Sequence, residues 1–131
     1  IVEKETSIPS ERSRIAAVFL NRLKKRIKLQ SDPTVIYAIT KGKYPLERQL
    51  SRKDLTINSS YNTYRYYGLP PAPIANPGID SIIAVLNPIK TNELFFVADG
   101  KGKHRFSKTL SEHNRNVNLL RKFERQQKNK K

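Results

Sequence analysis

Apolar residues near the start of the chain recur every three or four positions, which is the period of one face of an α-helix. Ser10 follows Pro9 and is suited to cap the start of this helix. The apolar positions are Ile15, Val18, Phe19, Leu23 and Ile27. The opposite face is polar, and we interpret it as a solvated surface formed by Arg12, Arg14, Asn21, Lys24, Lys25 and Lys28.

Two shorter helical segments follow, and a proline stands at the start of each. Asp32 precedes Pro33 and is placed to cap the first, because proline fits the first turn of a helix; residues 41–43 end it. Asn76 is expected to cap the second, with Pro77 at its first position. The apolar positions are Val35, Ile36 and Ile39 in the first helix, and Ile79, Ile82, Ile83 and Leu86 on one face of the second.

Residues 94–98, Leu-Phe-Phe-Val-Ala, give the strongest strand signal in the chain. Residues 99–103 contain two glycines and predict a turn, after which His104 begins the return strand of a hairpin. The predicted class is therefore α+β, a helix-rich single domain with a small β-hairpin.

A final helix is predicted after the hairpin. Thr109 and Glu112 have the spacing of a capping box, and Val117 and Leu120 are expected to be its buried positions. We divide the chain into a catalytic domain over residues 1–120 and a basic C-terminal tail over residues 121–131, which is expected to be solvated or frayed.

Between the second and third helices lies a segment that cannot be ordinary helix or central strand. Residues 61–64 read Tyr-Asn-Thr-Tyr, and residues 68–78 contain four prolines and two glycines. Proline fixes φ and removes a backbone donor, so this segment is predicted to be a stiff, extended loop. Tyrosine and asparagine on a stiff loop suit the binding of sugars, peptides or bases, and a purely structural connector is an equally good interpretation.

The charge of the chain points to an anionic partner. Its 131 residues include 26 Lys and Arg against 11 Asp and Glu, a formal net charge of +15. Nucleic acid, anionic lipid and anionic wall polymers would all be attracted to it. There is no cysteine and there are two histidines, too few for a convincing metal cluster. The chain opens without methionine, and we expect it to be a piece of a longer protein.

Two carboxylates near the start are candidates for acid–base chemistry. Glu3 and Glu5 lie two positions apart, so on a helix they point about 200° from one another. They cannot share a proton, and at most one faces a given pocket, while the other is expected at the surface. Composition alone does not separate a catalytic glutamate from one that interacts with the helix dipole.

Four ordered blocks of sequence resemble the YceG-like catalytic domain over about residues 1–117. The first is Glu3-Lys4-Glu5-Thr6 with residues 10–12 and 18–23, and the second is Leu-Gln-Ser-Asp-Pro-Thr-Val-Ile-Tyr at residues 29–37. The third is residues 61–64 with residues 68–71 and 73–78, and the fourth is residues 96–100 with His104, Phe106, His113 and Asn114.

The resemblance implies an endolytic lytic transglycosylase. Such an enzyme cleaves the β-1,4 bond between MurNAc and GlcNAc in peptidoglycan, leaves a 1,6-anhydro-MurNAc end and limits the length of glycan strands. The family's catalytic acid maps onto Glu5, in the Lys-Glu-Thr step, and no metal or other cofactor is implied. The residues expected to line the substrate groove are Gln30, Asp32, Tyr61, Asn62, Thr63 and Tyr64.

The resemblance also implies partners and a location. Glycan strands are the substrate, peptidoglycan synthases are candidate partners, and the basic patches could face an anionic membrane surface. Family members carry a membrane helix and a LysM-like subdomain that this sequence does not include, so we expect the cell envelope, in the periplasm or on the outer face of the cytoplasmic membrane.

Three other functions compete with this one. A basic nucleic-acid-binding module would use the tyrosines around Arg65 as a stacking platform, although no zinc spacing or RNP-type motif supports it, and no nucleic acid is expected. A wall-binding module without catalysis would also fit the charge. A small-molecule lyase would need a lysine in a cofactor site, and none is singled out by the sequence.

Overall fold

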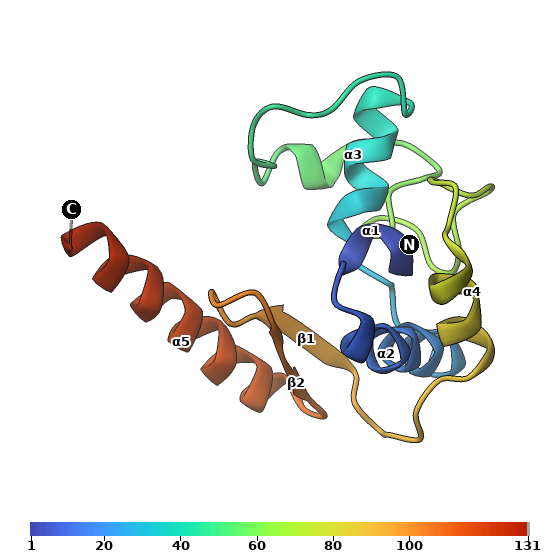
Figure 1. Cartoon of the computed structure of the whole chain (residues 1–131). Helices are drawn as coiled ribbons and strands as arrows, with labels where there is room; N and C mark the ends of the chain where they lie inside the picture. The colour runs from blue at the N-terminus through green and yellow to red at the C-terminus, as the bar shows by residue number, and fades with distance from the viewer. Residues whose placement is uncertain (131) are drawn as a thin grey trace.

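A computed structural model describes residues 1–130 as a helix-rich α+β domain, which confirms the predicted fold class (Figure 1). Its helices are α1 (Val2–Glu5), α2 (Arg12–Lys24), α3 (Asp32–Thr40), α4 (Ile79–Leu86) and α5 (Leu110–Asn129). Strands β1 (Phe95–Ala98) and β2 (His104–Ser107) form an antiparallel hairpin, in which Phe96 pairs with Phe106. Two short 3₁₀ turns, Pro9–Glu11 and Asp54–Thr56, complete the elements.

The hydrophobic core lies where α1, α2 and the hairpin meet. Val2, Ile15, Ala16, Phe19 and Leu29 form one buried cluster. Phe96 and Phe106 of the hairpin pack against this cluster, and the Phe19 and Phe96 rings meet edge to face at 5.6 Å. The predicted apolar face of α2 therefore supplies the core, and Ile27 lies beyond the end of the helix at Lys24.

The helix starts differ from the predicted caps by one or two residues. Glu11 rather than Ser10 precedes α2, because Pro9–Glu11 first makes a 3₁₀ turn. Ser31 is the N-cap of α3, so Asp32 is its first residue and not its cap. Gly78, not Asn76, precedes α4, and the Glu3 carboxylate accepts a hydrogen bond from the Gly78 N–H at 2.6 Å.

The polar face of α2 is only partly solvated, which corrects the interpretation made from sequence. Arg14 makes a bidentate pair with the buried carboxylate of Glu93, with N–O distances of 2.7 and 2.6 Å. Asn21 donates to the carbonyl oxygens of Thr91 and Glu93. These bonds fasten the segment that leads into β1 along the length of α2.

The apolar face of α4 does not enter the core. The helix buries Ser81 and Ala84 and lies beside α2. The isoleucines and leucine predicted to share one face are solvent-exposed, at 72% for Ile79, 46% for Ile82, 49% for Ile83 and 74% for Leu86.

Helix α5 lies on the hairpin, which separates it from the other helices in Figure 1. Its start matches the prediction, since the Thr109 hydroxyl accepts a hydrogen bond from the Glu112 N–H. Val117 and Leu120 are half-buried rather than fully buried. The helix passes residue 120 without a break and continues to Asn129.

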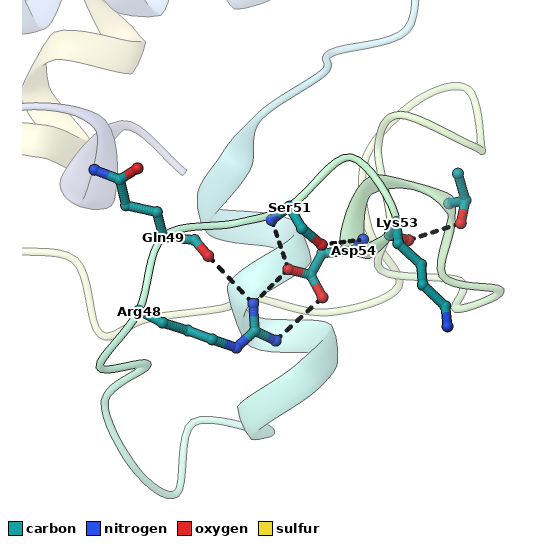
Figure 2. Close-up of polar contacts among 6 residues, drawn as sticks. Arg48, Gln49, Ser51, Lys53 and Asp54 are labelled. Atoms are coloured by element: carbon teal, nitrogen blue, oxygen red, sulfur yellow. Dashed lines mark hydrogen bonds and ion pairs between the residues drawn. The ribbon is translucent and has the colours of Figure 1, made fainter.

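The segment between α3 and the tyrosine–proline loop is held by a local ion pair. Figure 2 shows the Arg48 guanidinium bonded to both carboxylate oxygens of Asp54, at 2.6 and 3.1 Å. The Ser51 N–H donates to the same carboxylate at 2.7 Å. The guanidinium and this N–H hold the pKa of Asp54 far below its usual range, so its charge is retained at any physiological pH.

Residues 61–78 contain neither helix nor strand, as their prolines predict. The start of this loop is organised by Asn62, which is fully buried. Its amide donates to the carbonyl oxygens of Leu55 and Ile57, each at 2.9 Å, and its side-chain oxygen accepts from the Tyr64 N–H at 2.9 Å. One side chain thus supplies the hydrogen bonds that a strand partner would otherwise provide.

We expect Asn62→Ala to lower the free energy of unfolding by about 2–3 kcal/mol, because it leaves buried backbone groups without partners. Thermal unfolding followed by circular dichroism measures the change. Asn58→Ala is the matched control, because Asn58 is exposed and a surface substitution usually changes stability by less than about 0.5 kcal/mol. Equal unfolding temperatures for the two variants would contradict this account.

Candidate active site

A cavity of about 360 Å³ opens between α1, α2, the hairpin and the turn before α3. This size is in the range of small-ligand sites. Polar and titratable groups gather in it from segments far apart in the sequence. They are Glu5, Arg22, Gln30, Asp32, Tyr64, His104 and His113, with Phe95 and Phe96 among the apolar lining residues.

Glu5 stands at the end of α1 with its carboxyl group toward this cavity. The pKa of Glu5 is raised to about 7, chiefly by burial and to a smaller extent by the nearby charge of Asp32, while the Ser31 hydroxyl acts in the opposite direction. That hydroxyl donates to the Glu5 carboxylate at 3.0 Å. A carboxylic acid with this pKa can both donate and accept a proton near neutral pH.

The backbone of Ser31, which carries this hydroxyl, is held in place by a pair of buried threonines. The Thr63 hydroxyl accepts a hydrogen bond from the Ser31 N–H at 2.9 Å and bonds to the Thr34 hydroxyl at 2.8 Å. The Gln30 N–H donates to the Thr63 carbonyl oxygen at 3.3 Å. We call these four residues the threonine clamp; it joins the turn before α3 to the tyrosine–proline loop.

Asp32 and Tyr64 meet across the clamp, beside Glu5. The Tyr64 hydroxyl donates to a carboxylate oxygen of Asp32 at 2.5 Å. Burial, followed by this bond, raises the pKa of Tyr64 well above its ordinary value. The phenol therefore stays protonated and donates to the Asp32 carboxylate, which lies in the same cavity as Glu5.

The hairpin brings a histidine, His104, that the sequence placed in a family block without assigning it to the site. The His104 Nδ1 lies 2.6 Å from one carboxylate oxygen of Glu11, and its backbone N–H donates to the other at 3.0 Å. Glu11 is buried, so the ring of His104 is fixed at the cavity wall. No local pattern in the sequence indicates this contact, because Glu11 lies 93 residues earlier in the chain.

Two further residues, which the sequence placed in the family blocks without assigning them to the site, complete the wall. Arg22 is buried on α2, donates to the carbonyl oxygens of Leu94 and Lys28, and sits over the Phe95 ring. The imidazole ring of His113, on α5, stacks on the Phe95 ring, with the ring centroids 4.9 Å apart. Burial lowers the pKa of His113. The neutral imidazole thus adds a flat surface rather than a charge.

The predicted groove residues divide into two sets. Gln30, Asp32 and Tyr64 line the cavity together with Glu5. Asn62 and Thr63 are buried beneath it and use their polar atoms inside the protein, and the Tyr61 ring packs on Tyr37 at 4.9 Å. For Asn62 and Thr63 the structure shows a role in building the loop, and their contact with substrate stays a prediction.

Glu3 faces away from Glu5, as the helical spacing predicts, but it is not a free surface residue. Its carboxylate accepts hydrogen bonds from the Gly78 N–H and the Ser81 hydroxyl, at 2.6 and 3.0 Å, and these bonds lower the pKa of Glu3. Glu3 therefore holds the start of α4 and stays ionised. The two glutamates are set apart by their environments.

Comparison with known proteins identifies the class. The model of the YceG-like family matches residues 1–119, so the chain belongs to this family. It is 50% identical over 115 residues to the endolytic murein transglycosylase of Bacillus subtilis strain 168, covering 88% of this chain and 31% of that protein. It is 38% identical over 121 residues to the protein of the same name from Streptococcus pneumoniae strain D39, covering 89% of this chain and 22% of that protein.

A solved structure shows the same fold. The crystal structure of a YceG-like protein from Listeria monocytogenes superposes with a TM-score of 0.77 at 46% identity, covering 87% of this chain and 35% of the other. The chain thus spans about a third or less of the length of these relatives.

Within residues 1–130, no three His, Cys, Asp or Glu side chains are grouped so that they could hold a metal ion. None of the helices described over this range has the length and apolar character needed to cross a bilayer.

The environment of Glu5 predicts opposite effects for two neighbouring substitutions. Ser31→Ala should raise the pKa of Glu5, because it removes a donor to the charged form; Asp32→Asn should lower it, because it removes a negative charge. Carbon-13 NMR titration of the Glu5 carboxyl group measures both. Shifts in the same direction would contradict these roles, and no shift in either variant would show that burial alone sets this pKa.

The raised pKa also makes folding stability depend on pH. Between the ordinary value of 4.5 and about 7 the unfolded chain has lost the Glu5 proton and the folded chain retains it, so stability falls as pH rises through this range. Above pH 7 the cost is about 3 kcal/mol, at about 1.4 kcal/mol per pKa unit.

Glu5→Gln should remove this dependence. Its unfolding temperature should be close to that of the wild type near pH 4.5 and higher than it at pH 8. Glu112→Gln, an exposed glutamate of α5, is the control and should follow the wild type at both pH values. If the unfolding temperatures of Glu5→Gln and the wild type changed in parallel with pH, the pKa of Glu5 would be the same in the folded and unfolded chain.

Proposed function

We propose that this chain is the catalytic domain of an endolytic lytic transglycosylase that cleaves the glycan strands of peptidoglycan. The observation that carries the proposal is the Glu5 carboxyl group, which lies in a cavity of about 360 Å³ with its pKa raised to about 7. Membership of the YceG-like family and the names of the relatives support the same class of substrate.

In the first step the protonated Glu5 donates its proton to the oxygen of the β-1,4 bond between MurNAc and GlcNAc. The bond from this oxygen to C1 of MurNAc breaks, and positive charge develops on C1 and the ring oxygen. Desolvation by the cavity walls keeps the acid protonated until substrate binds, and the Ser31 hydroxyl stabilises the carboxylate that the transfer leaves.

In the second step the C6 hydroxyl of the same MurNAc attacks C1, and the Glu5 carboxylate takes the hydroxyl proton. A 1,6-anhydro ring closes, Glu5 regains its original protonation state, and no water is consumed. One carboxyl group thus serves as acid and then base, which agrees with the different environments of Glu3 and Glu5.

The remaining groups of the cavity suit the positive charge that develops on the sugar. The Asp32 carboxylate is fixed by the Tyr64 hydroxyl in the same cavity as Glu5, so it can stabilise the oxocarbenium-like state together with the N-acetyl group of the substrate. Phe95 and Phe96 offer apolar faces to the sugar rings, and Gln30 is exposed at the cavity edge as a hydrogen-bonding group.

The proposed reaction also suggests a location and partners for the domain. Glycan cleavage places the domain at the cell envelope, where its net charge of +15 is attracted to anionic lipid and to wall carboxylates. Limiting strand length would bring it near peptidoglycan synthases. Cleavage within strands, rather than at their ends, is consistent with a cavity that opens to solvent beside Gln30.

The test is mass spectrometry of purified glycan strands digested with the chain. We expect internal fragments that end in 1,6-anhydro-MurNAc. Glu5→Gln should lower their rate of formation by about 10²–10⁴, the contribution of a general acid–base group. Glu3→Gln, the same chemical change on the other glutamate, should keep forming them.

Other products would change the assignment. Reducing-end fragments would show hydrolysis in place of transglycosylation. Loss of activity in Glu3→Gln but not in Glu5→Gln would show that Glu3, not Glu5, is the catalytic carboxylate. A folded wild type that binds strands without cleaving them would fit a wall-binding module.

A further inference from the structure

A second and larger groove lies on the other side of α1. Its volume is about 1270 Å³, and it is bounded by α1, by the end of α3 with the turn after it, and by the proline loop over residues 73–78. None of the cavity residues around Glu5 lines it, yet both sites share α1, since Lys4 faces this groove and Glu5 the other. The two sites therefore lie on opposite sides of one short helix, α1.

The side chains of the groove select for an anion with some apolar character. Lys4, Lys41 and Lys43 contribute ammonium groups, and Tyr37 and Tyr44 contribute aromatic rings. Within residues 1–130 none of these lysines is in an ion pair, so their charges are available to a ligand. Glu3 also lines the groove, but its carboxylate is bonded to the Gly78 N–H and the Ser81 hydroxyl.

The turn that carries Lys41 and Lys43 is held by hydrogen bonds. Lys41 has a left-handed backbone with φ of 57°, a conformation that glycine usually provides and that is found at functional sites. Its N–H donates to the Tyr37 carbonyl oxygen at 2.7 Å, and the Lys43 N–H donates to that of Thr40 at 3.1 Å. The Thr40 hydroxyl accepts from the Gly42 N–H at 3.2 Å. The two ammonium groups are therefore presented from a fixed turn.

We propose that this groove binds the carboxylate-bearing peptide stems that project from the glycan strand, while the sugars occupy the cavity at Glu5. This inference deepens the proposed function and rests on its substrate class. The peptide is the part of peptidoglycan that carries negative charge, and lysines that lack partners beside tyrosine rings match its carboxylates and side chains. The domain would thus recognise strands by their stems as well as by their sugars.

Binding of two matched substrates tests the proposal. Fluorescently labelled glycan strands are prepared with their peptide stems intact and with the stems removed by an amidase, and Kd is measured by fluorescence anisotropy. The Glu5→Gln variant is used throughout, so that strands stay uncut. We expect stem-bearing strands to bind at least about ten-fold tighter than stripped strands.

Lys41→Gln/Lys43→Gln should lower this ratio by about five- to ten-fold, the loss expected from two exposed charge pairs. Lys122→Gln/Lys128→Gln removes the same charge from exposed positions on α5 and should preserve the ratio. Circular dichroism checks that both variants fold.

Two results would overturn the proposal. One is equal Kd for stem-bearing and stripped strands. The other is an equal fall of the ratio in both double variants, which would mean that net charge alone attracts the stems. Because binding is measured in Glu5→Gln, these results are independent of cleavage. If the Kd ratio is found but the wild type forms no anhydro products, the stem-binding groove is supported and the proposed reaction is contradicted.

Discussion

The candidate site depends on one buried hydrogen-bond cluster, the threonine clamp of Gln30, Ser31, Thr34 and Thr63. It fixes the turn before α3 against the tyrosine–proline loop, and the hydroxyl groups of Ser31, Thr34 and Thr63 all find partners inside the protein. In a dry environment such a cluster has few alternative arrangements, because any other geometry leaves a buried donor or acceptor unpaired. The Ser31 hydroxyl at Glu5 and the Tyr64 hydroxyl at Asp32 both follow from it.

The rest of the site is organised around α2. Its apolar face supports α1, and its polar face holds the strand entry through Arg14 and Asn21, while Arg22 reaches the carbonyl oxygen of Leu94. The acid and the aromatic wall opposite it are therefore both attached to a single helix. The α4 helix, by contrast, lies beside α2 with its large apolar residues in solvent.

Local patterns in the sequence were enough for the elements and not for the contacts between them. The 3.6-residue period located α2, the prolines located the irregular loop, and the Thr109–Glu112 spacing located the start of α5. The burial of Glu11 and Glu93 could not be predicted, because their partners His104 and Arg14 lie 93 and 79 residues away along the chain. The exposure of the α4 isoleucines was missed for a related reason: periodicity identifies an apolar face without saying what covers it.

The same distinction applies to the site. Glu5, Gln30, Asp32 and Tyr64 were named from sequence and do share a cavity, whereas Asn62 and Thr63 were grouped with them as neighbours in the chain. A buried polar side chain on a loop makes its hydrogen bonds within the protein. Burial depends on the tertiary structure, so the local sequence does not reveal it. The role given to Glu5 came from the family resemblance, and the physical reason for its raised pKa became visible only with the surrounding walls.

The Arg14–Glu93 pair has an evolutionary consequence. It lies outside the cavity, but it sets where the strand that carries Phe95 and Phe96 begins. Loss of Arg14 alone leaves the Glu93 carboxylate largely removed from water and without its partner, and loss of Glu93 alone releases Arg14, while a paired change can conserve the link. These two positions should therefore co-vary among members of the family, and paired exchanges there offer a way to shift the aromatic wall without altering any residue that meets the substrate.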